Sequence, residues 1–391
     1  MGASRAHVAG MEIEPDIPDL DQDACYRAVL TRDARFDGRF FGAVKTTGIY
    51  CRPVCPARTP LRRNMVFYPS AAAAEIAGFR ACLRCRPETA PDMGAWRGTS
   101  NTVSRALALI DAGALDSGSR SGGDVDALAN RLGVGERQLR RLFRRHLGAA
   151  PISVAQTRRV LLAKSLIHDT DLGMAEVALA SGFGSVRRFN ETFQALYHRP
   201  PSDLRRHSTR RDAGPGVRLR LPWRPPYDWH AMMQALAARG DHVAEGCWTR
   251  VLERAVDAAE GRVSVAFRED DALDVRVVID DLRALPRILA RVRCVFDLSA
   301  DPAAIATDLS RDPLLKPLVA RRPGLRLPGE WIDLDHPADL AASDAIAGDL
   351  PNTLLHRAEA WRPWRAYALL HLQAARVRLA DIPEIPHDQA A

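Results

Sequence analysis

A cysteine pair lies in TTGIYCRPVCPAR at residues 46–58, and a second pair lies in GFRACLRC at residues 78–85. The four cysteines follow the spacing Cys51-x3-Cys55-x26-Cys82-x2-Cys85. Four thiolates at two short spacings can surround one Zn²⁺ tetrahedrally, and the long connection can supply the hydrophobic elements that hold the pairs together. The alternative, free cysteines packed in a small core, is weaker because chance seldom places two such pairs in one basic segment. The sequence therefore predicts a zinc site.

The residues around these cysteines match the pattern of a known family. Besides the two cysteine stretches, the match includes Asn64-x-x-Phe67-Tyr68, and it covers nearly all of residues 22–90. The pattern resembles the N-terminal zinc domain of Ada-type adaptive response proteins, with no visible departure in the ligands. The resemblance implies that three further residues hold the DNA backbone near the site, although each of them could also be ordinary surface: Thr47, Arg52 and Arg58.

The same resemblance implies a reaction at one of the four sulfurs. Cys51, the first ligand, would take a methyl group irreversibly from a methylphosphotriester in the DNA backbone. Zinc-bound thiolates are anionic and nucleophilic at neutral pH without a general base, which supports this role on physical grounds. Methylation removes one negative charge beside a phosphate backbone, so the methylated form should bind DNA more tightly. In a second interpretation the zinc is only structural and the chain is a pure regulator.

Two amphipathic helix pairs follow, each joined at a glycine. The first is VDALANRLGVGERQLRRLF at residues 125–143, with its turn at Gly133, and the second is MAEVALASGFGSVRRFNETF at residues 174–193, with its turn at Gly182. The apolar spacing is helical, and a long helix around residues 154–167 should join the two pairs. The side chains expected to face inward are Leu139, Leu142 and Phe143 in the first pair, and Val186, Phe189 and Phe193 in the second.

Two helix pairs in tandem, followed by Tyr197-x-Arg199-x-Pro201-Ser202, look like an AraC-type DNA-binding domain over residues 102–208. The resemblance implies that the second helices enter successive major grooves, roughly 34 Å apart on one DNA face. Their outward residues would then contact base edges or phosphates. A helical protein-interaction module is the alternative. The candidate DNA contacts are Arg137, Gln138, Arg141, Arg187, Arg188 and Asn190.

The last third of the chain mixes strands and helices. Alternating apolar residues predict strands at 217–221, 263–267 and 275–279, with helical segments between them. The stretches LRLPWRPPYDW from Leu219 and RPGLRLPG from Arg322 are similar to the N-terminal portion of AlkA-type 3-methyladenine DNA glycosylases. This part is therefore expected to be α+β.

AEAWRPWRAYALLHL at residues 358–372 resembles the final helix of the same glycosylase family. That family places a helix-hairpin-helix, an aromatic pocket and a catalytic Asp before this helix, and residues 330–357 are too few to hold them all. Asp349 is the remaining candidate carboxylate, but no Gly-rich hairpin precedes it, and Gln373 stands where the family usually has a pocket tryptophan. A solvated Asp349 is therefore favoured. Core positions are expected for Trp361, Trp364 and Tyr367.

The charge distribution favours a polyanionic partner. Lys and Arg outnumber Asp and Glu by 12 to 5 over residues 22–90 and by 16 to 6 over residues 131–211, whereas the whole chain carries only +7. Two basic segments beside an acidic remainder point to DNA, with solvated arginine faces as the alternative. No stretch reaches the roughly 18 to 20 apolar residues of a membrane span, and no signal pattern opens the chain, so a cytoplasmic protein without membrane partners is expected.

Together these features predict a multidomain fold with a small α/β zinc domain, an all-α tandem helix-turn-helix domain, and an α+β C-terminal domain with an incomplete helical glycosylase part. The expected boundaries are a mobile tail at 1–21, the zinc domain at 22–90, the helix-turn-helix domain at 100–209, the AlkA-type domain at 216–328 and the glycosylase remnant at 329–391.

The expected function is that of a methylation-responsive transcription activator that binds double-stranded DNA, works with RNA polymerase, and repairs methylphosphotriesters as a single-turnover, zinc-dependent methyltransferase. The alternative is a bifunctional regulator and glycosylase that also excises alkylated bases such as 3-methyladenine. An internal deletion is expected to have removed the second activity.

Overall fold

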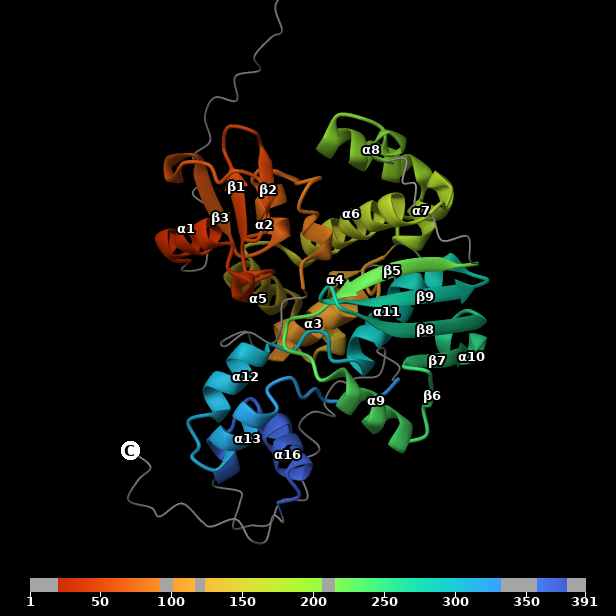
Figure 1. The fold of residues 1–391 in the computed structure, drawn as a ribbon. Helices are drawn as coiled ribbons and strands as arrows, with labels where there is room; N and C mark the ends of the chain where they lie inside the picture. The colour runs from red at the N-terminus through yellow and green to blue at the C-terminus, as the bar shows by residue number, and fades with distance from the viewer. Residues whose placement is uncertain (1–19, 92–100, 117–123, 206–214, 332–356, 378–391) are drawn as a thin grey trace, which may run out of the picture.

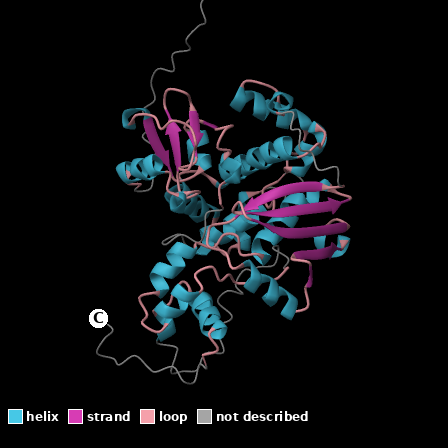
Figure 2. Ribbon diagram, viewed as in Figure 1, coloured by secondary structure: helices cyan, strands magenta, loops and turns pink. Residues whose placement is uncertain are grey.

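The computed structural model describes residues 20–91, 101–116, 124–205, 215–331 and 357–377 (Figure 1). The chain forms several domains: a small α/β unit, a helical domain, and a C-terminal part that contains a second sheet. Figure 2 shows the strands confined to two separate sheets, with helices of the middle domain lying between them. Residues 1–19 of the tail expected at 1–21, and residues 117–123, lie outside the described residues.

The N-terminal unit is a four-stranded sheet of order β3-β1-β2-β4 flanked by two helices. Strand β2 pairs with β4 in parallel, with Ile49 opposite Arg80 and Tyr50 opposite Ala81. This register brings the residues after each pair, Cys51 and Cys82, to the same end of the sheet. The elements are α1 (Gln22–Thr31), η1 (Ala34–Phe36), β1 (Phe41–Val44), β2 (Ile49–Cys51), η2 (Arg62–Asn64), β3 (Met65–Tyr68), α2 (Ala71–Ile76), β4 (Arg80–Ala81) and η3 (Pro87–Thr89).

The middle domain is entirely helical in its described part and contains both expected helix pairs. Gly133 and Gly182 lie at the two turns with φ of +69° and +89°, a backbone conformation that favours glycine. The long helix α6 joins the pairs, which confirms the expected arrangement. The elements are α3 (Asn101–Asp111), α4 (Val125–Arg131), α5 (Glu136–Leu147), α6 (Pro151–Asp169), α7 (Met174–Ala180), α8 (Val186–Tyr197) and η4 (Pro201–Leu204).

One inward assignment in the second helix pair is wrong. Phe189 and Phe193 are fully buried as expected, but Val186 is 38% exposed. Val186 is the first residue of α8. Because side chains on a helix tilt toward its N-terminus, the side chain of the first residue projects past the end of the helix and away from the core.

The C-terminal part contains an antiparallel five-stranded sheet of order β5-β9-β8-β7-β6. The three expected strands are confirmed within β5, β8 and β9, whereas β6 and β7 were not expected from the sequence. Strand β7 places Arg250 between the buried Trp248 and Leu252, so its apolar alternation is weak. The elements are β5 (Val217–Pro222), α9 (Trp229–Ala238), β6 (His242–Ala244), β7 (Cys247–Leu252), α10 (Arg254–Asp257), β8 (Gly261–Arg268), β9 (Ala272–Ile279), η5 (Leu282–Ala284), α11 (Leu285–Val295), α12 (Pro302–Leu309), α13 (Leu315–Arg321) and α16 (Arg365–Ala374).

Helices α12, α13 and α16 share a small core of their own. Trp361 and Trp364 are buried in it, and their indole N–H groups donate to Asp312 (2.7 Å) and Asp308 (3.0 Å). Tyr367 is also buried, and its hydroxyl donates to a carboxylate. The core role expected for these three aromatic residues is therefore confirmed.

A larger core joins the second helix pair to the sheet of the C-terminal part. It runs without interruption from Val160 and Phe183 to Leu219 and Trp248. The two domains therefore stabilise each other through buried apolar surface. Among the described residues, none of the helices has the length and apolar character that crossing a membrane would require.

Candidate metal centre and DNA-facing helices

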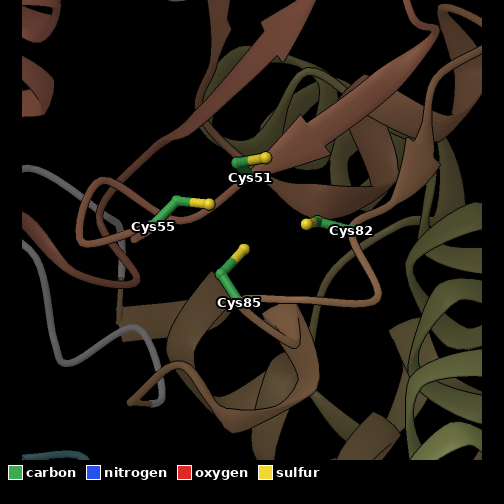
Figure 3. A group of neighbouring side chains, drawn as sticks. All are labelled: Cys51, Cys55, Cys82 and Cys85. Carbon is green, nitrogen blue, oxygen red and sulfur yellow. The ribbon is translucent and has the colours of Figure 1, made fainter. Parts of the chain in front are cut away.

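Four cysteine sulfurs converge at the end of the N-terminal sheet. Cys51 ends β2, Cys55 lies in the loop that follows, and Cys82 and Cys85 come directly after β4. Their Sγ atoms all lie within 4.8 Å of one another (Figure 3). The parallel pairing of β2 with β4 accounts for this geometry, because it places two cysteines at one sheet edge. The structure thus brings together the residues predicted as metal ligands.

The four sulfurs differ in their surroundings. Cys55, Cys82 and Cys85 are buried, whereas Cys51 is only half-buried. The Sγ of Cys85 accepts the backbone N–H of Arg52 (3.4 Å), and the Sγ of Cys82 accepts that of Arg84 (3.3 Å). The backbone N–H of Ala57 likewise favours the Cys55 thiolate. Cys51 is therefore the ligand most open to an external molecule.

The donor set fits zinc. Four cysteine sulfurs at these separations suit the tetrahedral geometry and the Zn–S distance of ~2.3 Å found in structural zinc sites. Hydrogen bonding from Cys51 lowers the pKa of Cys55 to about 7, and the same neighbour lowers the pKa of Cys82. Hydrogen bonding from Cys55 raises the pKa of Cys51, and the pKa of Cys85 is also raised, because the lowering effect of Cys51 is outweighed by Cys55 and Cys82. Two of the four sulfurs thus favour the thiolate form, and a bound cation would favour that form in all four. By contrast, burial raises the pKa of Cys25, which lies outside the cluster, to about 11.

The three residues expected at the DNA backbone lie in different surroundings. Thr47 and Arg58 are exposed. Arg52 is mostly buried instead: it forms an ion pair with Asp37 and donates to the Thr89 hydroxyl at 2.7 Å. Its guanidinium is thus engaged within the protein.

The candidate DNA contacts of the middle domain are all exposed on two helices. Figure 1 shows α6 between α5, which carries the first set, and α8, which carries the second. Two of the basic residues pair with neighbours one turn away, Arg140 with Glu136 and Arg187 with Glu191. The exposed candidates are Arg137, Gln138, Arg141, Arg187, Arg188 and Asn190.

The glycosylase candidate Asp349 lies outside the described residues. The tryptophans of the neighbouring motif, Trp361 and Trp364, are buried against α12 and α13. Gln373 is exposed on α16. Among the described residues, this region therefore offers no aromatic surface for stacking a flipped base.

Sequence reasoning missed a polar interface between the zinc site and α6. Lys164 forms a buried ion pair with Glu88 at 2.7 Å. Glu75 accepts from the Tyr50 hydroxyl (3.0 Å) and from the Thr157 hydroxyl (2.6 Å). Lys164 and Glu88 are 76 positions apart in the chain, and no local pattern links them.

Three family models match successive parts of the chain. Residues 24–88 match the metal binding domain of Ada, residues 128–207 match a helix-turn-helix domain, and residues 218–332 match the AlkA N-terminal domain. The matches follow the same order as the zinc site, the helix pairs and the second sheet.

Several relatives are similar over one or more of these parts. The probable bifunctional transcriptional activator/DNA repair enzyme AlkA of Mycobacterium tuberculosis is 42% identical over 317 residues, covering 79% of this chain and 62% of that protein. The bifunctional transcriptional activator/DNA repair enzyme Ada of Escherichia coli is 37% identical over 140 residues, covering 36% of this chain and 37% of that protein. The chain thus spans about three fifths of the mycobacterial relative.

Among solved structures, the refined structure of the DNA methyl phosphotriester repair domain of Escherichia coli Ada is 53% identical. It covers 17% of this chain and 74% of that domain, with a TM-score of 0.17.

Proposed function

We propose that this chain, which combines an Ada-type metal-binding domain, a helix-turn-helix domain and an AlkA-type N-terminal domain, is a methylation-responsive DNA-binding transcription regulator. In this proposal it also repairs methylphosphotriesters in DNA, once per molecule, by moving the methyl group onto Cys51. The single observation that carries the proposal is the cluster of four cysteine sulfurs in which Cys51 is the most exposed.

Burial and hydrogen bonding support Cys51 as the methyl acceptor. A thiolate that accepts an N–H bond holds its lone pair more tightly and reacts more slowly. Cys82 and Cys85 accept such bonds, and their burial keeps a DNA backbone at a distance. Cys51 is the ligand with an open approach. An attacking methyl ester would therefore meet the Cys51 sulfur first.

The transfer is a substitution at the methyl carbon. The Cys51 thiolate forms an S–C bond while the ester C–O bond breaks, and the electron pair stays on the phosphate oxygen. Bound zinc supplies the charge that keeps the four thiols deprotonated at neutral pH. The products are a thioether at Cys51 and an ordinary phosphodiester, so the acceptor is consumed.

The same step provides the switch. The unmodified centre is anionic and repels the DNA backbone. A thioether is neutral, so methylation removes one negative charge and strengthens binding to a polyanion. Thr47 and Arg58, both exposed, are the proposed contacts to the DNA backbone beside the centre. Arg52 is proposed to stabilise the centre itself, because its backbone N–H donates to the Sγ of Cys85 and its side chain donates to Thr89. Base and phosphate contacts are assigned to the exposed residues of α5 and α8.

Mass spectrometry tests the repair step. The full chain is incubated with a duplex that carries one methylphosphotriester, then digested and analysed. We expect the mass of one methyl group on the peptide that holds Cys51. Cys51→Ser should accept none, while Cys247→Ser, which alters a partly exposed cysteine outside the cluster, should accept methyl as the unaltered chain does. An unmodified Cys51 after complete exposure contradicts the repair proposal, and methylation at another cysteine contradicts the assignment.

For the C-terminal part we propose a domain at 216–328 followed by a glycosylase remnant at 329–391 that lacks base excision. The zinc and helix-turn-helix domains are proposed at residues 22–90 and 100–209. RNA polymerase is the proposed partner for the activation of transcription. Burial of Trp361 and Trp364 supports the lack of base excision, because their ring faces pack in the core of α12, α13 and α16 and are not open to stack on a flipped base. Release of 3-methyladenine from alkylated DNA, abolished by Asp349→Asn, would restore the alternative.

A further inference from the structure

The two helix pairs can be aligned residue by residue through their buried positions. Leu139 and Phe143 of α5 are fully buried, as are Phe189 and Phe193 at the same spacing in α8. Both helices have 12 residues, and both end at a residue of left-handed conformation. The alignment therefore makes Val186 the counterpart of Glu136, each the first residue of its helix.

These two counterparts differ in chemistry. Glu136 carries a charge and bonds to Arg140 at 3.0 Å. Val186 is apolar and 38% exposed, and it lies outside the core that holds Phe189 and Phe193. Its neighbours Ser185 and Arg187 are both exposed. An apolar, branched side chain thus projects from the end of a helix whose surroundings are polar and basic.

In a helix-turn-helix, residues near the N-terminus of the second helix contact base edges in the major groove. The apolar group that base pairs present there is the C5-methyl of thymine, and apolar side chains are the ones that contact it. Valine has no hydrogen-bonding group, so it can discriminate bases only in this way. Arg187 and Arg188, the next two residues of the same turn, supply positive charge for the phosphates nearby.

We propose that Val186 recognises the C5-methyl group of one thymine in the target of the second helix pair. Because Glu136 occupies the equivalent place in the first pair, this thymine contact is confined to the second pair. This inference rests on the proposed DNA-binding function and adds the base that one residue selects.

The test removes single methyl groups from the DNA. The full chain first selects duplexes from a random library. Each thymine of the selected duplex is then replaced in turn by deoxyuridine, which differs only by that methyl group. We expect one thymine in one half-site at which the replacement weakens binding about fourfold, the factor that corresponds to burying one methyl group. Val186→Ala should bind the two duplexes equally well.

Two controls separate this contact from a general loss of affinity. Val251→Ala removes a valine that is 71% exposed on β7, far from either recognition helix in sequence, and should keep the fourfold preference. Circular dichroism should show that Val186→Ala keeps its helical content.

The outcomes distinguish this inference from the function on which it rests. A chain that enriches no sequence contradicts the proposed DNA-binding function and this inference together. A chain that enriches a sequence but tolerates deoxyuridine at every thymine overturns the inference alone. The same holds if Val186→Ala retains the full preference for thymine.

Discussion

Lys164 of α6 and Glu88 of η3 form an ion pair at 2.7 Å, and their side chains are only 0% and 1% exposed. Glu88 follows Cys85 of the four-cysteine cluster by three residues, while Lys164 lies in the helix that joins the two helix pairs. Burial disfavours a charged carboxylate, but the Lys164 ammonium lowers the pKa of Glu88, so the pair is charged. The metal centre is therefore fixed to the DNA-binding domain through α6.

Breaking this pair should loosen the contact between the two domains. Lys164→Met leaves Glu88 buried without its main partner, which costs roughly 3 to 5 kcal/mol. The loss of stability should lie at the lower end of this range, because Arg86 remains 3.2 Å from Glu88. Amide hydrogen exchange measures this loss, because the amides of α6 should exchange faster in the variant. Arg187→Ala, which breaks the exposed pair with Glu191, is the control and should change stability by at most about 1 kcal/mol.

The double variant Lys164→Met with Glu88→Leu completes this experiment. Because no unpaired charge stays buried, most of the lost stability should return. Equal destabilisation by the single and the double variants would mean that the charge pair is not what holds the interface.

Removal of the metal should unfold the N-terminal unit and leave the helical domain intact. Zinc binding supplies roughly 10 to 16 kcal/mol in small zinc domains, more than the two small cores of this unit can replace. Cys55→Ser should lower the zinc content measured by atomic spectroscopy to a small fraction, while Cys25→Ala, outside the cluster, should retain one zinc per chain. A Cys55→Ser chain with full zinc occupancy would contradict the four-cysteine site.

Arg58 and Arg52 should respond differently to substitution. Arg58 is exposed, so Arg58→Ala should leave the stability of the chain unchanged. It should reduce the slope of the logarithm of the DNA-binding constant against the logarithm of the salt concentration by about 0.9, which is the share of one phosphate contact. Arg52→Gln breaks the pair with Asp37 and the bond to Thr89 and should destabilise the zinc domain. Salt titrations of DNA binding and thermal unfolding measure the two effects. An unchanged salt slope for Arg58→Ala would remove it from the DNA contacts.

The free energy of unfolding should decrease as the pH falls, because a histidine in α16 is buried. His371 is 3% exposed, and burial, with a smaller effect of Arg322, lowers its pKa to about 4. The unfolded chain takes up this proton near pH 6.5, before the folded chain does. The stabilising contribution is therefore complete above pH 6.5 and is lost as the pH falls toward 4, by about 3 kcal/mol in total.

His371→Gln isolates this effect. The difference in unfolding free energy between the original chain and the variant should be constant above pH 7 and should shrink steadily between pH 6.5 and 4. A difference that stays constant over the whole range would show that His371 titrates normally.

The sequence by itself determined the metal site and the helix pairs. Two short cysteine spacings favour local geometries that suit a metal ion, and the apolar period of 3.6 residues predicts Leu139 and Phe189 to be buried, as they are. Such features depend on residues close together in the chain, so a single sequence is enough to predict them.

Only the tertiary structure decided which groups meet across domains and which apolar residues lie at helix ends. Lys164 meets Glu88, and Arg52 meets Asp37, through contacts that no local pattern encodes. Val186 has the spacing of a core residue, since it lies three positions before Phe189, yet it is exposed because its side chain projects beyond the first turn of α8. Periodicity tells which side of a helix a residue lies on, but not whether any neighbour covers that side.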